Sequence, residues 1–140
     1  MLNNNVIYIL TVLEAIEKIS IYSKNFKTPD ELYWANDQIN FNASVNLLIA
    51  IGEETKKIDS NLKFDYQEIH WKAICGLRDK VAHNYRGIDP VIIWSVIKDE
   101  LPILKIAMVS MIKKLDLNKD LLKEFIDNKY YKHLTYLIEV

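Results

Sequence analysis

Glycine and proline are scarce in this chain, with three residues of each among 140. Because these two residue types interrupt regular structure most often, their scarcity argues against a loop-rich fold. The apolar residues recur at spacings of three and four rather than two, as they do along one face of an α-helix. We therefore expect an all-α fold, a bundle of about five helices that forms a single domain over residues 1–140.

Cysteine and long apolar stretches are also nearly missing. Cys75 is the only cysteine, which excludes an internal disulfide and indicates a reducing compartment, and we interpret it as a small core residue. The first residues, MLNNNVIYIL, lack a basic leader, and no run approaches the ~18 apolar residues of a membrane span. We expect a cytoplasmic protein that does not interact with a membrane.

Neither sign of charge is in excess, because the formal net charge is −1. A protein that binds nucleic acid through overall basicity is therefore excluded, and any site for a polyanion has to be a compact basic patch. The stretch 72–89 is locally positive, with four cations and two carboxylates. These are Lys72, Arg78, Lys80 and Arg86 against Asp79 and Asp89. We expect a phosphate group to bind there.

The first two helices are predicted from an apolar stripe and from a start signal. The first should run from Asn3 to Tyr22, and its stripe comprises Val6, Ile9, Leu10, Leu13, Ile16 and Ile19. The second should begin after Thr28, which can act as N-cap, with Pro29 in the first helical position and Glu31 three residues beyond the cap. We expect it to continue to about Ile58.

A third helix is predicted from Asp65, with Glu68 three residues later and Phe64 stapled onto Ile69. Its apolar face should extend to Leu77.

A fourth helix is predicted from Asp89 and Pro90 by the same combination of cap and proline. Pro102 should kink or split it near Leu101. The remaining chain is typical of one continuing helix, in KIAMVSMIKKL, and one C-terminal helix, in DLLKEFIDNKYYKHLTYLIEV.

The string RDKVAHNYRGIDP, residues 78–90, gathers polar side chains where a helix should end. Arg78 and His83 lie about 140° and about 7.5 Å apart on an ideal helix, so they can converge only if the helix ends near Ala82. A histidine exchanges protons at neutral pH, and the planar arginine fork suits phosphate oxygens. The pair indicates cleavage or transfer at a phosphodiester, although such pairs also occur by chance in helical proteins.

The order Arg78, four residues, His83, one residue, Tyr85 resembles the signature of the HepT branch of HEPN-domain proteins, the toxin half of HepT/MNT toxin–antitoxin pairs. The flanking segments LLIAIGEETKKI, HWKAICGLRDKVAHNY and RGIDPVIIWSVIKDELPIL resemble that branch as well. Together they cover roughly residues 40 to 105. The resemblance does not extend beyond about Leu117.

This resemblance implies a HEPN-like fold of four to five helices, a homodimer, and a metal-independent endoribonuclease that acts on RNA without a cofactor. It places Arg78 and His83 in the catalytic roles. It makes Tyr85 the tyrosine that a partner nucleotidyltransferase, the antitoxin, modifies with AMP. Lys80, Asn84 and Arg86 flank the catalytic pair and are the candidate RNA-binding residues.

Metal-free cleavage of RNA can use the substrate's own 2′-hydroxyl as the nucleophile. That route needs a base for the hydroxyl, an acid for the leaving oxygen and cations at the phosphate. Each chain offers one motif histidine, so we expect two chains to meet motif to motif across a two-fold axis. His83 then acts as the base in one protomer and as the acid in the other.

One departure from the family concerns the residue after the arginine, which is often asparagine in the family and is Asp79 here. A carboxylate at this position can pair with Arg78 and weaken its hold on phosphate. Tyr85 can also simply pack its ring and hydrogen-bond its hydroxyl. The alternative function is a catalytically silent helical dimer that binds a nucleotidyltransferase or another partner.

Other chemistry is disfavoured. A metal site is not expected, because His70, His83 and His133 are far apart in the sequence and no zinc-type spacing is present. The three glycines are isolated from one another, so the chain has no glycine-rich loop for a phosphate.

Several further features have more than one interpretation. Gly52 and Glu53 indicate close helix packing with an ordinary Glu53–Lys57 ion pair, or else a role at the dimer or active-site surface. KYYKH, residues 129–133, fits a solvated helix face better than a platform for RNA bases. The tryptophans are expected to be core or interface residues: Trp34, Trp71 and Trp94.

Overall fold

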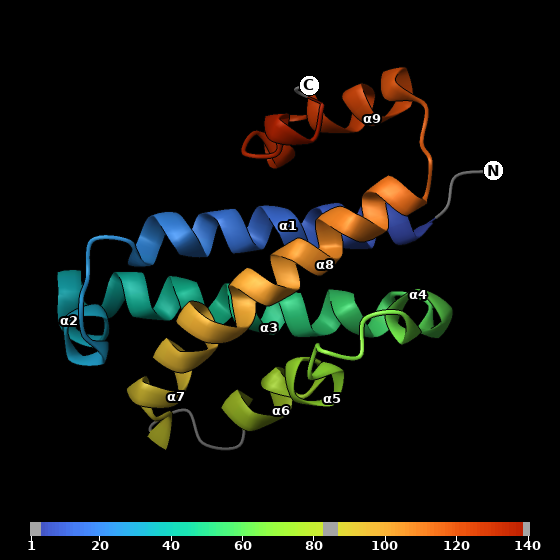
Figure 1. The fold of residues 1–140 in the computed structure, drawn as a ribbon. Coiled ribbons are helices and arrows are strands. Elements are labelled where there is room, and N and C mark those ends of the chain that lie inside the picture. Colours follow the sequence, from blue (N-terminus) through green and yellow to red (C-terminus); the bar gives the residue numbers. More distant parts are fainter. Residues whose placement is uncertain (1–3, 83–86, 139–140) are drawn as a thin grey trace.

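The computed structural model describes residues 4–82 and 87–138, and all regular structure in these two ranges is helical (Figure 1). This confirms the predicted all-α fold. The elements are α1 (Asn4–Ser23), α2 (Pro29–Trp34), η1 (Ala35–Gln38), α3 (Ile39–Lys57), α4 (Ser60–Phe64), α5 (Trp71–Cys75), α6 (Leu77–Ala82), α7 (Pro90–Ser95), η3 (Val96–Glu100), α8 (Leu101–Lys114), α9 (Lys119–Ile126), η4 (Lys129–Tyr131) and η5 (Thr135–Leu137).

Helix α1 lies at the centre of the packing. Figure 1 shows α3 antiparallel beside it, α8 crossing it and the C-terminal segment on the side away from α3, and α1 contacts α3, α8 and η4. The predicted stripe on α1 is buried throughout. Val12 and Ala15 lie outside that stripe and are buried as well. The buried surface of α1 is therefore wider than the predicted stripe, although Ile7 and Ile21 stay exposed.

The caps predicted at Thr28 and Asp89 are confirmed. The Thr28 hydroxyl accepts a hydrogen bond from the Glu31 N–H at 3.1 Å, and the Glu31 carboxylate accepts the Lys27 N–H at 2.6 Å. The Asp89 carboxylate accepts the Val91 N–H at 2.9 Å. Side-chain oxygens thus satisfy the backbone donors that the first turn of each helix leaves without partners.

The prediction of an unbroken second helix up to Ile58 is wrong. Helix α2 ends at Trp34, and Asn36, Asp37 and Gln38 then have φ angles of 51°, 57° and 68°. A residue in the left-handed backbone region costs roughly 1–2 kcal/mol. The sequence did not indicate this turn, because it contains no glycine or proline there. Trp34, with 66% of its surface exposed, is not a core residue.

The prediction of a third helix that starts at Asp65 is also wrong. Helix α4 ends at Phe64, and the next helix, α5, begins only at Trp71. Phe64 is 73% exposed, whereas Ile69 is buried, so the expected staple between these two residues is not formed. The Trp71 indole N–H instead donates to the Lys63 and Tyr66 carbonyls and holds the connecting segment in place.

Pro102 disturbs its helix as predicted. A proline has no N–H to donate, and its ring clashes with the carbonyl four residues earlier. The chain avoids this by forming a π-helical turn, η3, in which the Leu101 N–H bonds to the Val96 carbonyl. Helices α7 and α8 are thereby joined by a widened turn, without a loop.

The C-terminal segment is not the single helix that was predicted. Helix α9 ends at Ile126 and two short 3₁₀ turns follow, η4 and η5. Within 129–133, Tyr131 is buried and its hydroxyl lies 3.1 Å from the Thr11 hydroxyl. Lys129, Tyr130 and Lys132 are exposed, as a solvated face requires, whereas Tyr131 docks this stretch on α1.

A buried carboxylate fixes that docking. Glu14 of α1 is 1% exposed, and its two oxygens lie 2.9 Å from the His133 backbone nitrogen and 2.6 Å from His133 Nδ1. Nearby, burial and the neighbouring Glu17 carboxylate raise the pKa of Tyr136 above its usual range, so this phenol stays neutral. The Glu14 carboxylate therefore finds its partners on the C-terminal segment instead of in water.

Replacing His133 with alanine should destabilise the protein by roughly 3 kcal/mol, because a buried carboxylate that loses a partner keeps its desolvation cost. Urea unfolding of the two proteins measures the difference. His70→Ala is the matched control, since the His70 side chain is 71% exposed. Equal unfolding midpoints for His133→Ala and wild type would contradict the role given to the Glu14–His133 contact.

Candidate active site

Helix α6 presents the described part of the sequence motif at the surface. Leu77 and Val81, one turn apart, are buried and anchor the helix. Arg78, Asp79 and Lys80 lie between them on the exposed side. The Arg78 side chain is 62% exposed, so its guanidinium is accessible to a ligand.

Gly52 allows α3 and α5 to pack closely. A Cβ at this position would lie 2.7 Å from the Ile74 carbonyl oxygen, closer than a carbon and a backbone oxygen can approach. Any other residue at 52 would have to push the two helices apart. The sequence-based interpretation of Gly52 as a close-packing position is confirmed. Through this contact the residue after Gly52 on α3 comes close to α6.

That residue is Glu53, and its carboxylate lies 3.7 Å from an Arg78 Nη nitrogen. It also pairs with Lys56 at 3.3 Å, whereas Lys57 pairs with Glu54. The expected Glu53–Lys57 pair is therefore wrong. A role of Glu53 at the active-site surface stays a prediction, and its carboxylate lies beside Arg78.

Asp79 was expected to compete for Arg78. In residues 4–82 and 87–138, the carboxylate that pairs with Arg78 belongs to Glu53. Adjacent residues on a helix point in different directions, so Asp79 is poorly placed to bind the arginine next to it. The expected pairing of Asp79 with Arg78 is therefore not among the ion pairs of the described residues.

A cavity of about 180 Å³ lies between α6 and the start of α7. Lys80 lines it together with apolar side chains of both helices, including Val81 and Ile92. Gly87, Ile88 and Asp89, which precede α7, line it as well. His83, Asn84, Tyr85 and Arg86 lie outside the described residues, so the structure places Arg78 and Lys80 of the predicted site and leaves these four as predictions.

Within the described ranges, no three His, Cys, Asp or Glu side chains are grouped as a metal ion would require. In the same part of the chain, no helix combines the length and the apolar character needed to cross a membrane. Cys75 is half-buried, with its sulfur 3.5 Å from the Thr55 hydroxyl.

Comparison with known proteins gives one consistent match. Residues 12–111 match the family described as ribonuclease HepT-like. A probable ribonuclease HepT of Thermococcus cleftensis is 33% identical over 98 residues, which cover 70% of this chain and 86% of that protein. A putative RNase of Methanocaldococcus jannaschii is 32% identical over 109 residues, 78% of this chain and 88% of that protein.

The chain also resembles one part of a longer protein. A gamma-glutamylcyclotransferase and putative RNase of Methanocaldococcus jannaschii is 32% identical over 114 residues, which cover 81% of this chain and 50% of that protein. The similarity thus spans about half the length of this relative. No solved structure matches the chain significantly.

Gly52→Ala should lower the free energy of unfolding by about 1–3 kcal/mol, because the new methyl group overpacks the contact with the Ile74 carbonyl. In an uncrowded helix the same substitution stabilises the protein by about 1 kcal/mol. The sign of the change in the free energy of unfolding therefore distinguishes a crowded position from an uncrowded one. Denaturant unfolding measures the change. A Gly52→Ala protein as stable as wild type, or more stable, would rule out the close approach of α3 and α5.

Proposed function

Because the chain belongs to the HepT-like ribonuclease family, we propose that it is a metal-independent endoribonuclease whose catalytic residues are Arg78 and His83. The observation that carries the proposal is the exposed guanidinium of Arg78 on α6, one residue after the buried Leu77. His83 follows the last residue of that helix directly in the sequence. An exposed cation beside an imidazole is what phosphodiester cleavage requires.

Arg78 is suited to hold the phosphate. A guanidinium has five N–H donors, and the contact with Glu53, at 3.7 Å, is too long to occupy one fully. Ion pairs this exposed contribute at most about 1 kcal/mol, so Glu53 orients the arginine without cancelling its charge. Lys80, exposed on the same helix, adds a second cation for RNA. Asn84 and Arg86 supply further contacts to the RNA backbone.

The proposed reaction is a transesterification within the RNA. The 2′-oxygen forms a bond to the adjacent phosphorus while the bond from phosphorus to the 5′-oxygen breaks. One imidazole removes the 2′-hydroxyl proton, and a second gives a proton to the leaving 5′-oxygen. The products are a 2′,3′-cyclic phosphate and a 5′-hydroxyl.

This reaction needs a base and an acid near one phosphate, and we assign both roles to imidazoles. In the described ranges, His133 is held by Glu14 under the C-terminal segment, and His70 lies 3.4 Å from Glu100. Neither contact involves α6. The second imidazole therefore comes from His83 of a second copy, so the active unit is a homodimer with a composite site.

A neighbouring nucleotidyltransferase would act as the antitoxin by attaching AMP to Tyr85. The phosphate of AMP would add negative charge and bulk beside the catalytic pair, and it would repel the RNA backbone. The toxin would be active in the cytoplasm, where RNA is its substrate. The competing function, a silent dimer that binds the nucleotidyltransferase, is one of the outcomes of the assay below.

The purified protein should cleave single-stranded RNA in the presence of EDTA and leave 2′,3′-cyclic phosphate ends. Arg78→Ala and His83→Ala should each lower the rate by at least about 100-fold, because they remove phosphate binding and proton transfer. Arg78→Lys should recover only part of the loss, since lysine keeps the charge without the planar fork. Gel analysis of end-labelled RNA measures all four proteins.

His70→Ala is the control in this assay and should cleave at the wild-type rate. A mixed dimer with one His83→Ala chain should be as slow as the dimer of two such chains. A mixed dimer that retains wild-type activity would exclude the composite site. Cleavage by His83→Ala at the wild-type rate, or no cleavage by unmodified wild type, would favour the binding module.

Tyr85 should gain the mass of one AMP group when the chain is produced together with its nucleotidyltransferase and ATP. Tyr85→Phe lacks the phenolic oxygen and should stay unmodified while remaining an active ribonuclease. Mass spectrometry of the intact protein, followed by the cleavage assay, tests both statements. AMP on another residue, or a modified protein that still cleaves RNA at full rate, would contradict this regulation.

A further inference from the structure

The cavity of about 180 Å³ between α6 and the start of α7 has a buried floor and an exposed rim. We refer to it as the α6–α7 cavity. The floor consists of the core side chains Leu77, Val81 and Ile93. The rim consists of the exposed residues Lys80, Gly87, Asp89 and Ile92. The cavity is smaller than the roughly 300–1,000 Å³ pockets that hold drug-sized ligands, so it suits one flat ring of a ligand.

Two opposite charges line this otherwise apolar cavity. Asp89 uses one carboxylate oxygen, Oδ1, to accept the Val91 N–H at 2.9 Å, which leaves Oδ2 as an acceptor for a ligand. Lys80 contributes an ammonium group with three donors. No ion pair between residues of the ranges 4–82 and 87–138 includes either of them. The cavity therefore offers an acceptor and a donor to the edge of a ring.

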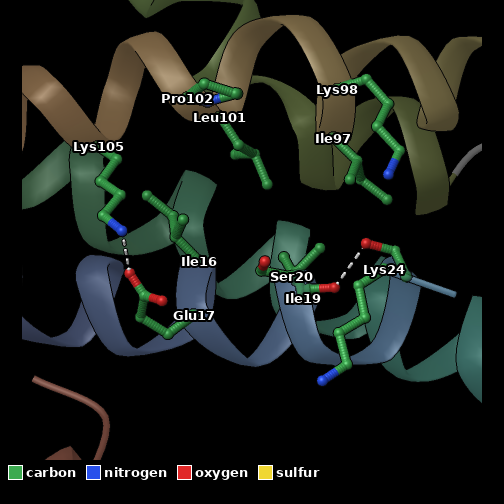
Figure 2. Close-up of a pocket in the computed structure, with 11 residues that line it drawn as sticks. Ile16, Glu17, Ile19, Ser20, Lys24, Ile97, Lys98, Leu101, Pro102 and Lys105 are labelled. Atoms are coloured by element: carbon green, nitrogen blue, oxygen red, sulfur yellow. Dashed lines mark hydrogen bonds and ion pairs between the residues drawn. The ribbon is translucent and has the colours of Figure 1, made fainter.

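The larger cavity of the molecule differs in this respect. A groove of about 440 Å³ lies between α1 and the helix formed by η3 and the start of α8 (Figure 2). Its interior is made of core side chains such as Ile19 and Leu101. Figure 2 shows Lys105 joined to Glu17 across the groove, with 2.6 Å between amine and carboxylate. Among its described lining residues the one carboxylate is thus already paired, whereas Asp89 in the α6–α7 cavity is not.

We propose that the α6–α7 cavity is a subsite for one base of the RNA and that it selects an amino-bearing base, cytosine or adenine, over uracil. This inference rests on the proposed ribonuclease function, which brings RNA to α6. Proteins hold an unstacked base between apolar or aromatic side chains and recognise it through hydrogen bonds to its edge. The apolar floor and Ile92 would cover the faces of the ring.

The two charges match the edge of such a base. The Asp89 carboxylate would accept a hydrogen bond from the exocyclic amine, as carboxylates do from N4 of cytosine. Lys80 would donate to the unprotonated ring nitrogen beside that amine. Uracil has a carbonyl oxygen in place of the amine, and a carboxylate repels this oxygen. The difference between the two pyrimidines therefore falls on the group that Asp89 contacts.

The position of Lys80 on α6 indicates which nucleotide enters the cavity. Two residues correspond to about 200° around a helix, so Arg78 and Lys80 lie on opposite flanks of α6. Arg78 is on the flank of Glu53, and Lys80 is on the flank of α7. A helix with its side chains is about 10–12 Å wide, and a strand rises about 3.4 Å per nucleotide, so the base belongs to a nucleotide about two or three positions from the phosphate at Arg78.

DNA strands of about 12 nucleotides test the subsite without cleavage, because they lack the 2′-hydroxyl that acts as nucleophile. The experiment uses fluorescein-labelled oligo-dC, oligo-dA and oligo-dU, and fluorescence anisotropy measures their affinity for the full chain. The wild type should bind oligo-dC and oligo-dA at least about fivefold more tightly than oligo-dU, as one additional hydrogen bond predicts.

Asp89→Asn is the diagnostic variant. Asparagine caps a helix as well as aspartate does, so its Oδ1 can keep the bond to Val91 while its amide nitrogen replaces the free acceptor with a donor. This variant should bind oligo-dU at least as tightly as oligo-dC. Ile92→Trp should fill the cavity and remove the preference. Asp120→Asn on the exposed side of α9 is the matched control and should keep the wild-type preference. Circular dichroism melting would verify that each variant folds.

An RNA of about 12 uridines with a single cytidine locates the subsite relative to the cleaved bond. The wild type should cut about two or three nucleotides from the cytidine, and Asp89→Asn should lose this selection. Equal binding of oligo-dC and oligo-dU by the wild type, or a preference that persists in Asp89→Asn or Ile92→Trp, would overturn the subsite. Cleavage of RNA without any base preference would also overturn it and leave the ribonuclease function intact. A base preference in binding, without cleavage of any RNA, would support the subsite and contradict the ribonuclease function.

Discussion

The burial of α1 on several sides is the constraint on which the rest of this structure depends. Helix α3 packs along it, α8 crosses it, and the C-terminal segment lies on the side away from α3. A helix enclosed in this way cannot leave a charged side chain without a partner, and Glu14 therefore holds His133 from the other end of the sequence. The positions of the α6 surface and of the groove between α1 and α8 follow from this arrangement, because α6 packs on α3 and both walls of the groove belong to helices that pack together.

Two residues that break ordinary helix packing create the two surfaces. Gly52 has no side chain, and the close contact that it allows between α3 and α5 brings Glu53 to Arg78. Pro102 lacks an N–H, and the widened turn that precedes it forms a wall of the groove. In both cases a local change in backbone chemistry alters the distance between two helices. A single residue of each pair of helices thus decides how closely the side chains of the two helices approach one another.

The candidate site was only partly predictable from the sequence. Arg78 was found because its spacing from the histidine resembles a known family, and Lys80 because it lies beside that pair in a locally positive stretch. The structure places both on the exposed side of α6. The contact between Glu53 and Arg78 was not predicted, since the two residues are far apart in the chain and lie on different helices. The π-helical turn beside the groove was indicated only as a kink at Pro102. A sequence motif shows which side chains carry the chemistry, whereas the packing of helices decides which charges lie next to them.

By itself, the sequence determined the helical class of the fold, the stripe of α1 and the caps at Thr28 and Asp89. These features depend on interactions within a few residues, and local patterns therefore predict them. Only the tertiary structure decided the left-handed turn at 36–38 and the shape of the C-terminal segment. The first is a strained backbone that the surrounding packing has to maintain. The second depends on a contact between Glu14 and His133, 119 residues apart, and no local pattern encodes a pairing over that distance.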